Sequence, residues 1–272
     1  MMLVDKAEVK KYEFTGETKQ VELLLRTVIL HRIRAVTDFG MVKAGELGGW
    51  IEKEENLSQE GKAWISDEAE VYGNAKISDN AHVADNAKVY DEAKVQSYAL
   101  VYGNAEISDN AFICSNVNVY GNAKVSGNAW IGDNAEISDN AKVGGYTKVH
   151  GNVKIYGNAK IWGNAVVCDN TNVYENARIY ENVKVQENAR ICGEAEVYSE
   201  NHILIIGPVG RKHFFITFFR DKDNEITVEC ANQSQKIDKF MEKVTLLHGN
   251  NKEGLIYRAA IEVARLQIDL RL

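Results

Sequence analysis

Two histidines, His82 and His150, offer the clearest chance of catalysis in this chain of 272 residues. Of the six histidines, these two fall inside a long repeated stretch. A neutral imidazole can act as a general base when a partner group holds its ring in place. His150 is the better candidate, because the repeat places it outward beside Cys168 and Gly132. No carboxylate stands among the neighbours that the repeat predicts, so an orienting partner would have to come from another subunit.

Other chemistry finds little support in the sequence. No Ser-His-Asp or paired-carboxylate arrangement is visible, since most acidic residues occupy turns. Cys114 and Cys168 share one register three coils apart, which is about 14 Å at roughly 4.8 Å per coil and too far for a disulfide. No Cys or Cys/His spacing indicates a metal site, and we expect free thiols. The glycines of residues 45–49 have the character of tight turns, because their spacing is not that of a phosphate loop.

The element that positions both histidines is a six-residue repeat from Ala63 to Val197. Each hexad holds a small residue, any residue and then Val or Ile, and the pattern runs through 23 hexads without an insertion. Such regularity predicts a solenoid. Each hexad gives a short strand with its Val or Ile facing inward, followed by a two-residue turn. Three such sides make an 18-residue triangular coil, so we expect about eight coils whose strands pair with the coils above and below.

Asparagine marks the turns. It fills the second of the two turn positions in 17 of the 23 hexads. Asn tolerates positive φ better than most residues, and its amide can bond the local backbone. We therefore expect the Asn residues to bend the chain at each corner.

The repeat resembles a known family. Val71-Tyr72-Gly73-Asn74-Ala75-Lys76 is similar to the motif of the hexapeptide-repeat, left-handed parallel β-helix family, the trimeric LpxA-like superfamily, and the likeness covers about half of the chain. The left hand of the coil is implied by this resemblance and not by the periodicity. Residues 38–40, 43–52 and 56–58 also resemble the leader of prophage-encoded hexapeptide-repeat proteins, many of which are catalogued as transferases without a demonstrated reaction.

The chain divides into three regions, which are residues 1–56, 57–200 and 201–272. In the first region we expect strands within residues 12–36, with a turn at residues 15–18, and the family likeness makes this region a β cap over the first coil. The pattern of apolar residues in the last region predicts a small α+β domain of three strands and two helices, with a turn at residues 207–210. It could cap the last coil or present a partner surface. The second helix has an apolar stripe at helical spacing: Leu255, Ala259, Val263 and Leu266.

The three outer faces of the solenoid differ in composition. On one face Phe112, Trp130 and Val166 flank small residues, and lysines stand toward both ends, which is the anatomy of an interface. We expect self-association there, as a trimer or dimer, with Cys114 and Cys168 in the same contact. The other two faces carry aromatic stripes, which either stabilise the strands as stacked pairs or form a binding surface. The stripe residues are Tyr72, Tyr90, Tyr102, Tyr120, Tyr156, Trp162, Tyr174, Tyr180 and Tyr198.

Net charge and hydropathy limit the partners and the cellular location that we expect. The net charge is −7, and residues 57–200 carry 12 basic and 20 acidic side chains. Nucleic acid is therefore a disfavoured partner, because phosphate binding needs a basic stripe. No apolar run reaches the length of a membrane span and no signal-peptide pattern opens the chain, so we expect a cytoplasmic protein, in the host cytoplasm if it is phage-encoded.

Two classes of function remain open, and the sequence favours the first. The first is a non-catalytic binding or scaffold protein, without a cofactor, that uses rigid faces for self-association and for binding an unknown host or phage protein. The second is a coenzyme A-dependent acyltransferase, because family acyltransferases bind acetyl-coenzyme A or another acyl donor between subunits and use a His as general base. A minor third alternative is an acidic mimic of nucleic acid that inhibits a host protein.

Overall fold

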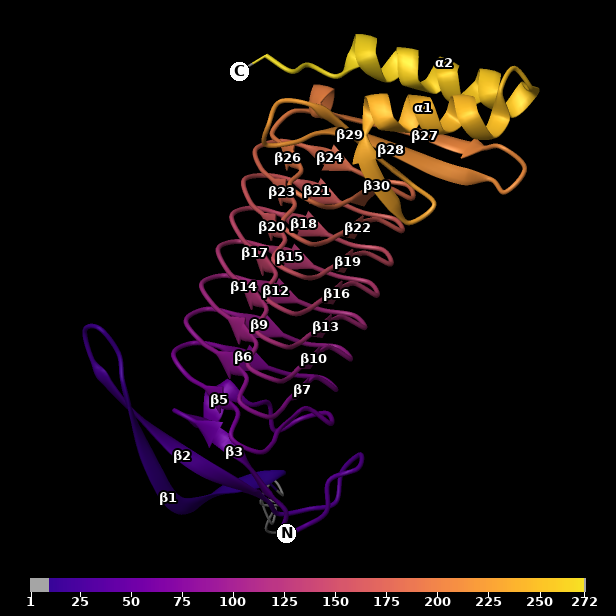
Figure 1. Ribbon diagram of the computed structural model, residues 1–272. Helices are drawn as coiled ribbons and strands as arrows, with labels where there is room; N and C mark the ends of the chain where they lie inside the picture. The colour runs from indigo at the N-terminus through magenta and orange to yellow at the C-terminus, as the bar shows by residue number, and fades with distance from the viewer. Residues whose placement is uncertain (1–9, 272) are drawn as a thin grey trace, which may run out of the picture.

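One two-residue strand per hexad builds about half of the chain (Figure 1). The computed structural model describes residues 10–271, so residues 1–9 of the expected N-terminal cap, and Leu272, lie outside the described part. The fold is mainly β. A β-solenoid of about eight turns runs from an N-terminal hairpin to a small C-terminal sheet with two helices.

The strands of the solenoid stack in three parallel sheets, each strand pairing with the strands one coil before and after it. In the 11-stranded sheet the solenoid strands are β5 (Glu70–Val71), β8 (Lys88–Val89), β11 (Glu106–Ile107), β14 (Lys124–Val125), β17 (Lys142–Val143), β20 (Lys160–Ile161), β23 (Arg178–Ile179) and β26 (Glu196–Val197). The eight-stranded sheet comprises β4 (Trp64–Ile65), β7 (His82–Val83), β10 (Leu100–Val101), β13 (Asn118–Val119), β16 (Glu136–Ile137), β19 (Lys154–Ile155), β22 (Asn172–Val173) and β25 (Arg190–Ile191). The seven-stranded sheet comprises β6 (Lys76–Ile77), β9 (Lys94–Val95), β12 (Phe112–Ile113), β15 (Trp130–Ile131), β18 (Lys148–Val149), β21 (Val166–Val167) and β24 (Lys184–Val185).

The core of the solenoid consists of the repeated small and aliphatic residues. Ala135 and Ile137 are fully buried, as are the equivalent residues of nearly every coil. Two threonines stand at alanine positions, and their buried hydroxyls donate to local carbonyls, Thr147 to Gly144 and Thr171 to Cys168. A buried hydroxyl needs such a partner, so these threonines fit the core without an unsatisfied group.

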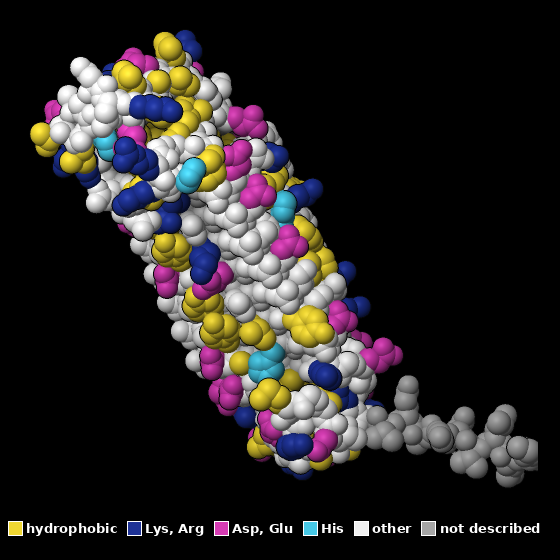
Figure 2. Space-filling model, turned by 90° about the vertical axis from the view of Figure 1, so that its right-hand side faces the viewer, with side chains coloured by type: hydrophobic (Ala, Val, Ile, Leu, Met, Phe, Trp, Pro, Cys, Tyr) yellow, Lys and Arg dark blue, Asp and Glu magenta, His cyan; other side chains and the backbone are white. Residues whose placement is uncertain are grey.

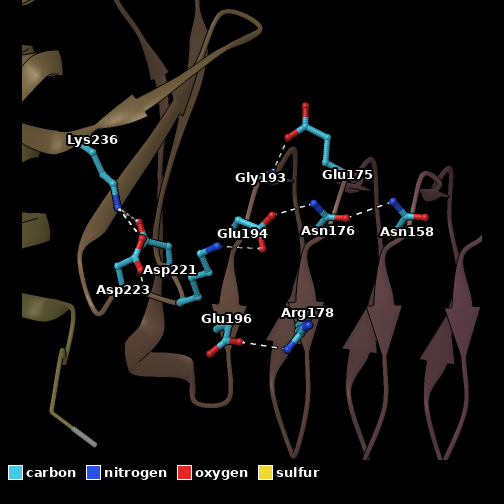
Figure 3. A network of polar contacts seen from close by, with 11 residues as sticks. Asn158, Glu175, Asn176, Arg178, Gly193, Glu194, Glu196, Asp221, Asp223 and Lys236 are labelled. Carbon is cyan, nitrogen blue, oxygen red and sulfur yellow. Dashed lines mark hydrogen bonds and ion pairs between the residues drawn. The ribbon is translucent and has the colours of Figure 1, made fainter.

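The corners of the coil correct one expectation. Positive φ falls on the first turn residue, which is Gly, Asp, Glu or Ser, and not on the Asn that follows it. Asp85 has φ of 57°, and its carboxylate accepts the backbone N–H of Gly103 in the next coil at 2.9 Å. The Asn side chains instead bond from coil to coil, as where Asn158 donates to Asn176 at 3.1 Å and Asn176 donates to Glu194 at 2.7 Å (Figure 3). The turn residues therefore join neighbouring coils as well as bending the chain.

The N-terminal region is a long hairpin that extends the largest sheet. β1 (Tyr12–Glu22) pairs antiparallel with β2 (Thr27–Ala35), and β2 pairs antiparallel with β3 (Leu47–Ile51). β3 then pairs in parallel with β5, the first solenoid strand of that sheet. Tyr12 lies in the same hydrophobic cluster as the solenoid core. A short 3-10 helix, η1 (Glu54–Asn56), leads into the repeat.

The turn expected at residues 15–18 is wrong. β1 continues through this segment with a register shift, where Gly16 has φ of 92°. The hairpin turns at residues 23–26 instead, and Leu24 and Leu25 are 98% and 93% exposed. The apolar residues Leu24 and Leu25 therefore lie in a loop. The turn falls there because this position lets the two long strands pair over most of their length.

The glycines before the repeat have two different roles. Gly45 has φ of 89° and turns the chain, as expected. Gly48 and Gly49 lie within β3, and a Cβ on either would come within 2.6 Å of a neighbouring side chain, Ile33 for Gly48 and Ile65 for Gly49. They are therefore required for close packing, whereas the sequence suggested turns.

The C-terminal region forms a four-stranded antiparallel sheet with two helices on the side away from the solenoid (Figure 1). The fourth strand was not expected, and the first strand runs through the residues expected as a turn. None of the helices within residues 10–271 is long and apolar enough to cross a membrane. The elements are η2 (Glu200–His202), β27 (Ile203–Val209), β28 (Phe214–Arg220), β29 (Ile226–Cys230), β30 (Gln233–Lys236), α1 (Ile237–His248) and α2 (Lys252–Gln267).

Helix α2 packs with a different face from the one that the sequence suggested. Leu255 and Leu266, from the expected apolar stripe, are 57% and 87% exposed. Tyr257 and Ile261 are buried in the cluster of the C-terminal domain. The helix has apolar residues on two faces, so its periodicity alone does not identify the packed one.

The last coil and the C-terminal sheet share a hydrophobic cluster and a polar network. Phe219 of β28 is fully buried in the cluster formed by the solenoid core. Arg190 of β25 donates from its backbone to the Thr217 hydroxyl at 3.0 Å and from Nε to the Glu229 carboxylate at 3.1 Å. Lys222 of the domain lies 3.8 Å from Glu194 at a solenoid corner. These contacts hold the domain against the last coil.

Candidate functional site

His150 follows β18 on the outer face of the seven-stranded sheet, and its side chain is 38% exposed. The structure corrects the expectation that no carboxylate is near. Asp133, at the corner of the preceding coil, has its Oδ2 3.8 Å from His150 Nδ1. The same oxygen accepts the backbone N–H of Gly151 at 2.9 Å, so Asp133 is held in place beside the imidazole. The separation of 3.8 Å is longer than a hydrogen bond.

Sequence reasoning missed Asp133 because it compared only the outward strand positions of adjacent coils. Asp133 is a turn residue, and it reaches His150 because the corner of one coil lies beside the strand end of the next. The signal was available in the sequence, since an acidic turn residue stands 17 positions before the histidine.

An indole lies beside His150, and two buried thiols lie on the same face. The Trp130 ring lies 5.9 Å from the imidazole, centroid to centroid. It folds over Gly132, where a Cβ would meet it at 2.8 Å. Burial raises the pKa of Cys114 and of Cys168, so both thiols stay protonated at neutral pH. A protonated thiol is a poor nucleophile, so neither cysteine is a better catalytic candidate on this face than His150.

The expected interface residues do lie side by side. Phe112 pairs with Trp130 across neighbouring strands, and Lys148 separates Trp130 from Val166. All three apolar side chains are half-buried in the single chain. Contact with a second subunit stays a prediction.

His82 lies on the eight-stranded sheet, so the fold does not bring the two histidines together. Its Nε2 is 3.1 Å from the Ser66 hydroxyl of the preceding coil, a contact that sequence reasoning also missed. That hydroxyl also lies 3.0 Å from the Asp67 carboxylate. Burial lowers the pKa of His82, so the ring is neutral at pH 7 and satisfied by a local hydrogen bond.

The tyrosines of the aromatic stripes stack in pairs. Three pairs are nearly parallel, with centroids 5.0–5.1 Å apart and interplanar angles of 4–6°. The fourth pair is tilted by 42°. Stacked aromatic pairs on adjacent strands stabilise a sheet, so these rings have a structural use whatever else they bind. The pairs are Tyr72–Tyr90, Tyr102–Tyr120, Tyr156–Tyr174 and Tyr180–Tyr198.

The side of the eight-stranded sheet shows how the solenoid surface is composed (Figure 2). Hydrophobic side chains form separate patches along it, with charged side chains between and beside them. A cavity of about 190 Å³ lies instead in the C-terminal domain, lined by Phe240, Tyr257 and His248 among others. Among residues 10–271, no group of three or more His, Cys, Asp or Glu side chains is placed to hold a metal ion.

The chain matches no known protein-family profile. It is 39% identical over 64 residues to a protein named as an uncharacterized acetyltransferase, YdcK, of Escherichia coli strain K12. The match covers 22% of this chain and 20% of that protein, so the similar stretch spans about a fifth of the relative's length. Together, the match and the β-solenoid fit a hexapeptide-repeat transferase family.

Proposed function

We propose that this chain is a hexapeptide-repeat acyltransferase that moves an acyl group from coenzyme A to an acceptor, with His150 as general base. The observation that carries this proposal is the Asp133 carboxylate fixed 3.8 Å from His150 Nδ1. The stretch similar to an acetyltransferase supports it independently.

The pair can perform one proton transfer. Asp133 faces Nδ1, so it favours the tautomer with the proton on that nitrogen and stabilises the imidazolium once it forms. Nε2 then takes the proton of an acceptor hydroxyl or amine while the acceptor oxygen or nitrogen attacks the thioester carbonyl. The carbon–sulfur bond breaks, the acceptor keeps the acyl group, and the coenzyme A thiolate leaves and takes the proton from the His150 imidazolium, which restores the neutral base. The contact between Asp133 and His150 shortens when substrate is bound, as catalytic hydrogen bonds commonly do.

We further propose a left-handed coil, capped at both ends, that works as an oligomer. The family resemblance implies the left hand and an acyl donor held between subunits. Burial of Tyr12 and Phe219 in the solenoid cluster supports caps at the two ends, because an open coil would expose apolar surface and a strand edge. The half-buried row of Phe112 and Trp130 supports contact between subunits on the face of His150.

The experiment is a release assay for the coenzyme A thiol with acetyl-coenzyme A and a panel of amine and hydroxyl acceptors. The expected result is acetyl transfer that His150→Ala lowers by about 10²–10⁴-fold, the usual contribution of a general base. Asp133→Asn should lower it less, and the matched control His82→Ala should leave it unchanged. Absence of any thermal shift with acetyl-coenzyme A, or equal loss in both histidine variants, would refute the assignment.

A second candidate function is a non-catalytic scaffold. It is favoured by the repeat from Ala63 to Val197, which has no inserted loop to enclose a substrate. In that case Trp130→Glu should separate subunits in sedimentation experiments and abolish partner binding, while Tyr102→Ser should not. A protein without transferase activity that still dissociates in the Trp130 variant would establish the scaffold in place of the enzyme.

A further inference from the structure

A row of basic side chains follows the outer face of the 11-stranded sheet. Lys124, Lys142, Lys160 and Arg178 stand in register on four successive strands, β14, β17, β20 and β23. Neighbouring strands lie about 4.8 Å apart, and like charges directly opposite each other destabilise a sheet. Such a row is unexpected in a repeat with more acidic than basic residues, so it calls for a counter-charge.

The chain itself neutralises only the ends of this row. Lys124 pairs with Glu106 at 2.8 Å and Arg178 with Glu196 at 3.3 Å. The two central lysines, Lys142 and Lys160, form no ion pair within residues 10–271. The positive charge of the row is therefore concentrated on its middle two strands.

The corner that follows the basic row carries no carboxylate in the coils of Lys124, Lys142 and Lys160. Along this corner the first turn residue is Asp91 and then Asp109 in earlier coils, and Glu181 in a later one. Between them stand three glycines with φ of 68–78°, stacked so closely that a Cβ on any of them would clash with the next coil. The result is an uncharged corner, with no side chain at its first turn position, beside the two free lysines. The glycines are Gly127, Gly145 and Gly163.

An exposed indole lies over the same coils. Trp162 follows β20, and its ring covers Gly144, where a Cβ would meet it at 2.6 Å. One side of the ring thus faces the sheet, while the side chain remains 39% exposed to solvent. Tyr146, which is 64% exposed, stands at the corner where most coils have Asn. A flat aromatic surface beside free lysines can stack a planar base while the lysines contact phosphate.

We propose that this surface, made by Lys142, Lys160, Trp162 and the glycine corner, binds a nucleoside phosphate. The base stacks on Trp162, and the phosphates lie across Lys142 and Lys160. The four basic strands span roughly 14 Å at 4.8 Å per strand, and Glu106 and Glu196 limit the row at its two ends. A site so bounded fits one nucleotide and not a nucleic-acid strand. The nucleotide could be free, or it could be the nucleotide portion of coenzyme A, and the proposal does not depend on His150, which lies on another sheet.

The test uses the full chain and titrates ADP, adenosine, pyrophosphate, coenzyme A and oligo(dT) by calorimetry and tryptophan fluorescence. Trp130→Phe serves as the background for fluorescence, because it removes the other partly exposed indole. Trp50 and Trp64 are buried, so a ligand that changes the emission then acts through contact with Trp162. ADP should bind more tightly than either adenosine or pyrophosphate. Lys142→Gln with Lys160→Gln should weaken ADP at least tenfold, and Trp162→Phe should remove the fluorescence change.

The matched control is Lys76→Gln with Lys94→Gln. These lysines also face each other in register, on β6 and β9, but they have no tryptophan or glycine corner beside them. Equal binding of ADP and coenzyme A through the two central lysines would show that the site reads the shared nucleotide. Binding of coenzyme A without ADP, tighter binding of oligo(dT) than of ADP, or the same loss in the control pair would each overturn the proposal.

Discussion

The first turn residue of each corner carries a strain that substitution at Asp139 can measure. Asp139 has φ of 57°, and its carboxylate accepts the Gly157 N–H of the next coil at 2.9 Å. Glycine occupies the same corner position in the coils before and after it, at Gly121 and Gly157. The corner therefore accepts Gly, and it accepts Asp with the added benefit of a hydrogen bond between coils.

Three substitutions separate the strain from the hydrogen bond. Asp139→Ala loses the acceptor, which costs about 1 kcal/mol for an exposed hydrogen bond. It also puts an alanine in the left-handed conformation, which costs about 1 kcal/mol more for Ala than for Asp. Asp139→Gly loses the acceptor, while the strain that it relieves and the chain entropy that it costs roughly offset each other, so it should cost about 1 kcal/mol. Asp139→Asn keeps an acceptor and tolerates positive φ, so it should cost about 0.5 kcal/mol. The expected order of stability is wild type, then Asn, then Gly, then Ala.

Urea unfolding followed by far-ultraviolet circular dichroism is the assay. The gap between Ala and Gly isolates the conformational cost, and about 1 kcal/mol changes the unfolding equilibrium roughly fivefold. Equal stability of the Ala and Gly variants would show that this corner carries no strain. A Gly variant as stable as wild type would show that the hydrogen bond between coils contributes nothing.

Three further changes test other parts of the fold. Ile137→Asp should cost at least about 4 kcal/mol and unfold the solenoid, because a carboxylate would enter a fully buried position without a partner. A folded variant with an unchanged melting temperature would contradict the inward position of this side chain. Removal of residues 201–272 should yield aggregates or filaments from the uncovered last coil, whereas a monodisperse truncation with an intact transition would show that the domain does not cap it. Burial lowers the pKa of Lys11 from 10.5 to about 8, so between these pH values the folded chain binds fewer protons than the unfolded chain. The free energy of unfolding should therefore rise with pH across this interval. Lys11→Met should remove that rise, as measured by the difference in melting temperature between variant and wild type from pH 7 to 10.

The regular part of this fold was predictable because the constraint repeats. A hexad that fails to place its aliphatic residue inward would break the ladder on both sides, so strand positions and buried residues follow from the period alone. The conformation of each turn residue is less constrained by the period. The sequence shows that residues such as Asp139 and Asn140 form a turn, but which of them takes positive φ depends on how the coils stack, since the first one also bonds the next coil.

The flanking regions and the candidate site were harder to predict for a different reason. Leu24 and Leu25 form an apolar run, yet hairpin pairing places them at an exposed tip. Helix α2 has two apolar faces, and only the sheet beneath it decides that Tyr257 packs inward. Asp133 approaches His150 across a corner, a contact between a turn and a strand that the strand register does not describe.

One last prediction joins the two proposed sites. Lys142 and His150 belong to the same coil, on either side of the corner at residues 145–146, so the basic row and the histidine face meet along that corner. A molecule with a nucleotide at one end and a thioester at the other could contact both faces by crossing the bare glycines. If the acyl donor does so, Lys142→Gln with Lys160→Gln should raise the KM for acetyl-coenzyme A about tenfold and leave kcat nearly unchanged. His150→Ala should do the reverse, because binding energy at the nucleotide is separate from proton transfer at the acceptor. An unchanged KM in the lysine variant, with ADP binding lost, would mean that the nucleotide site and the transferase site serve different ligands.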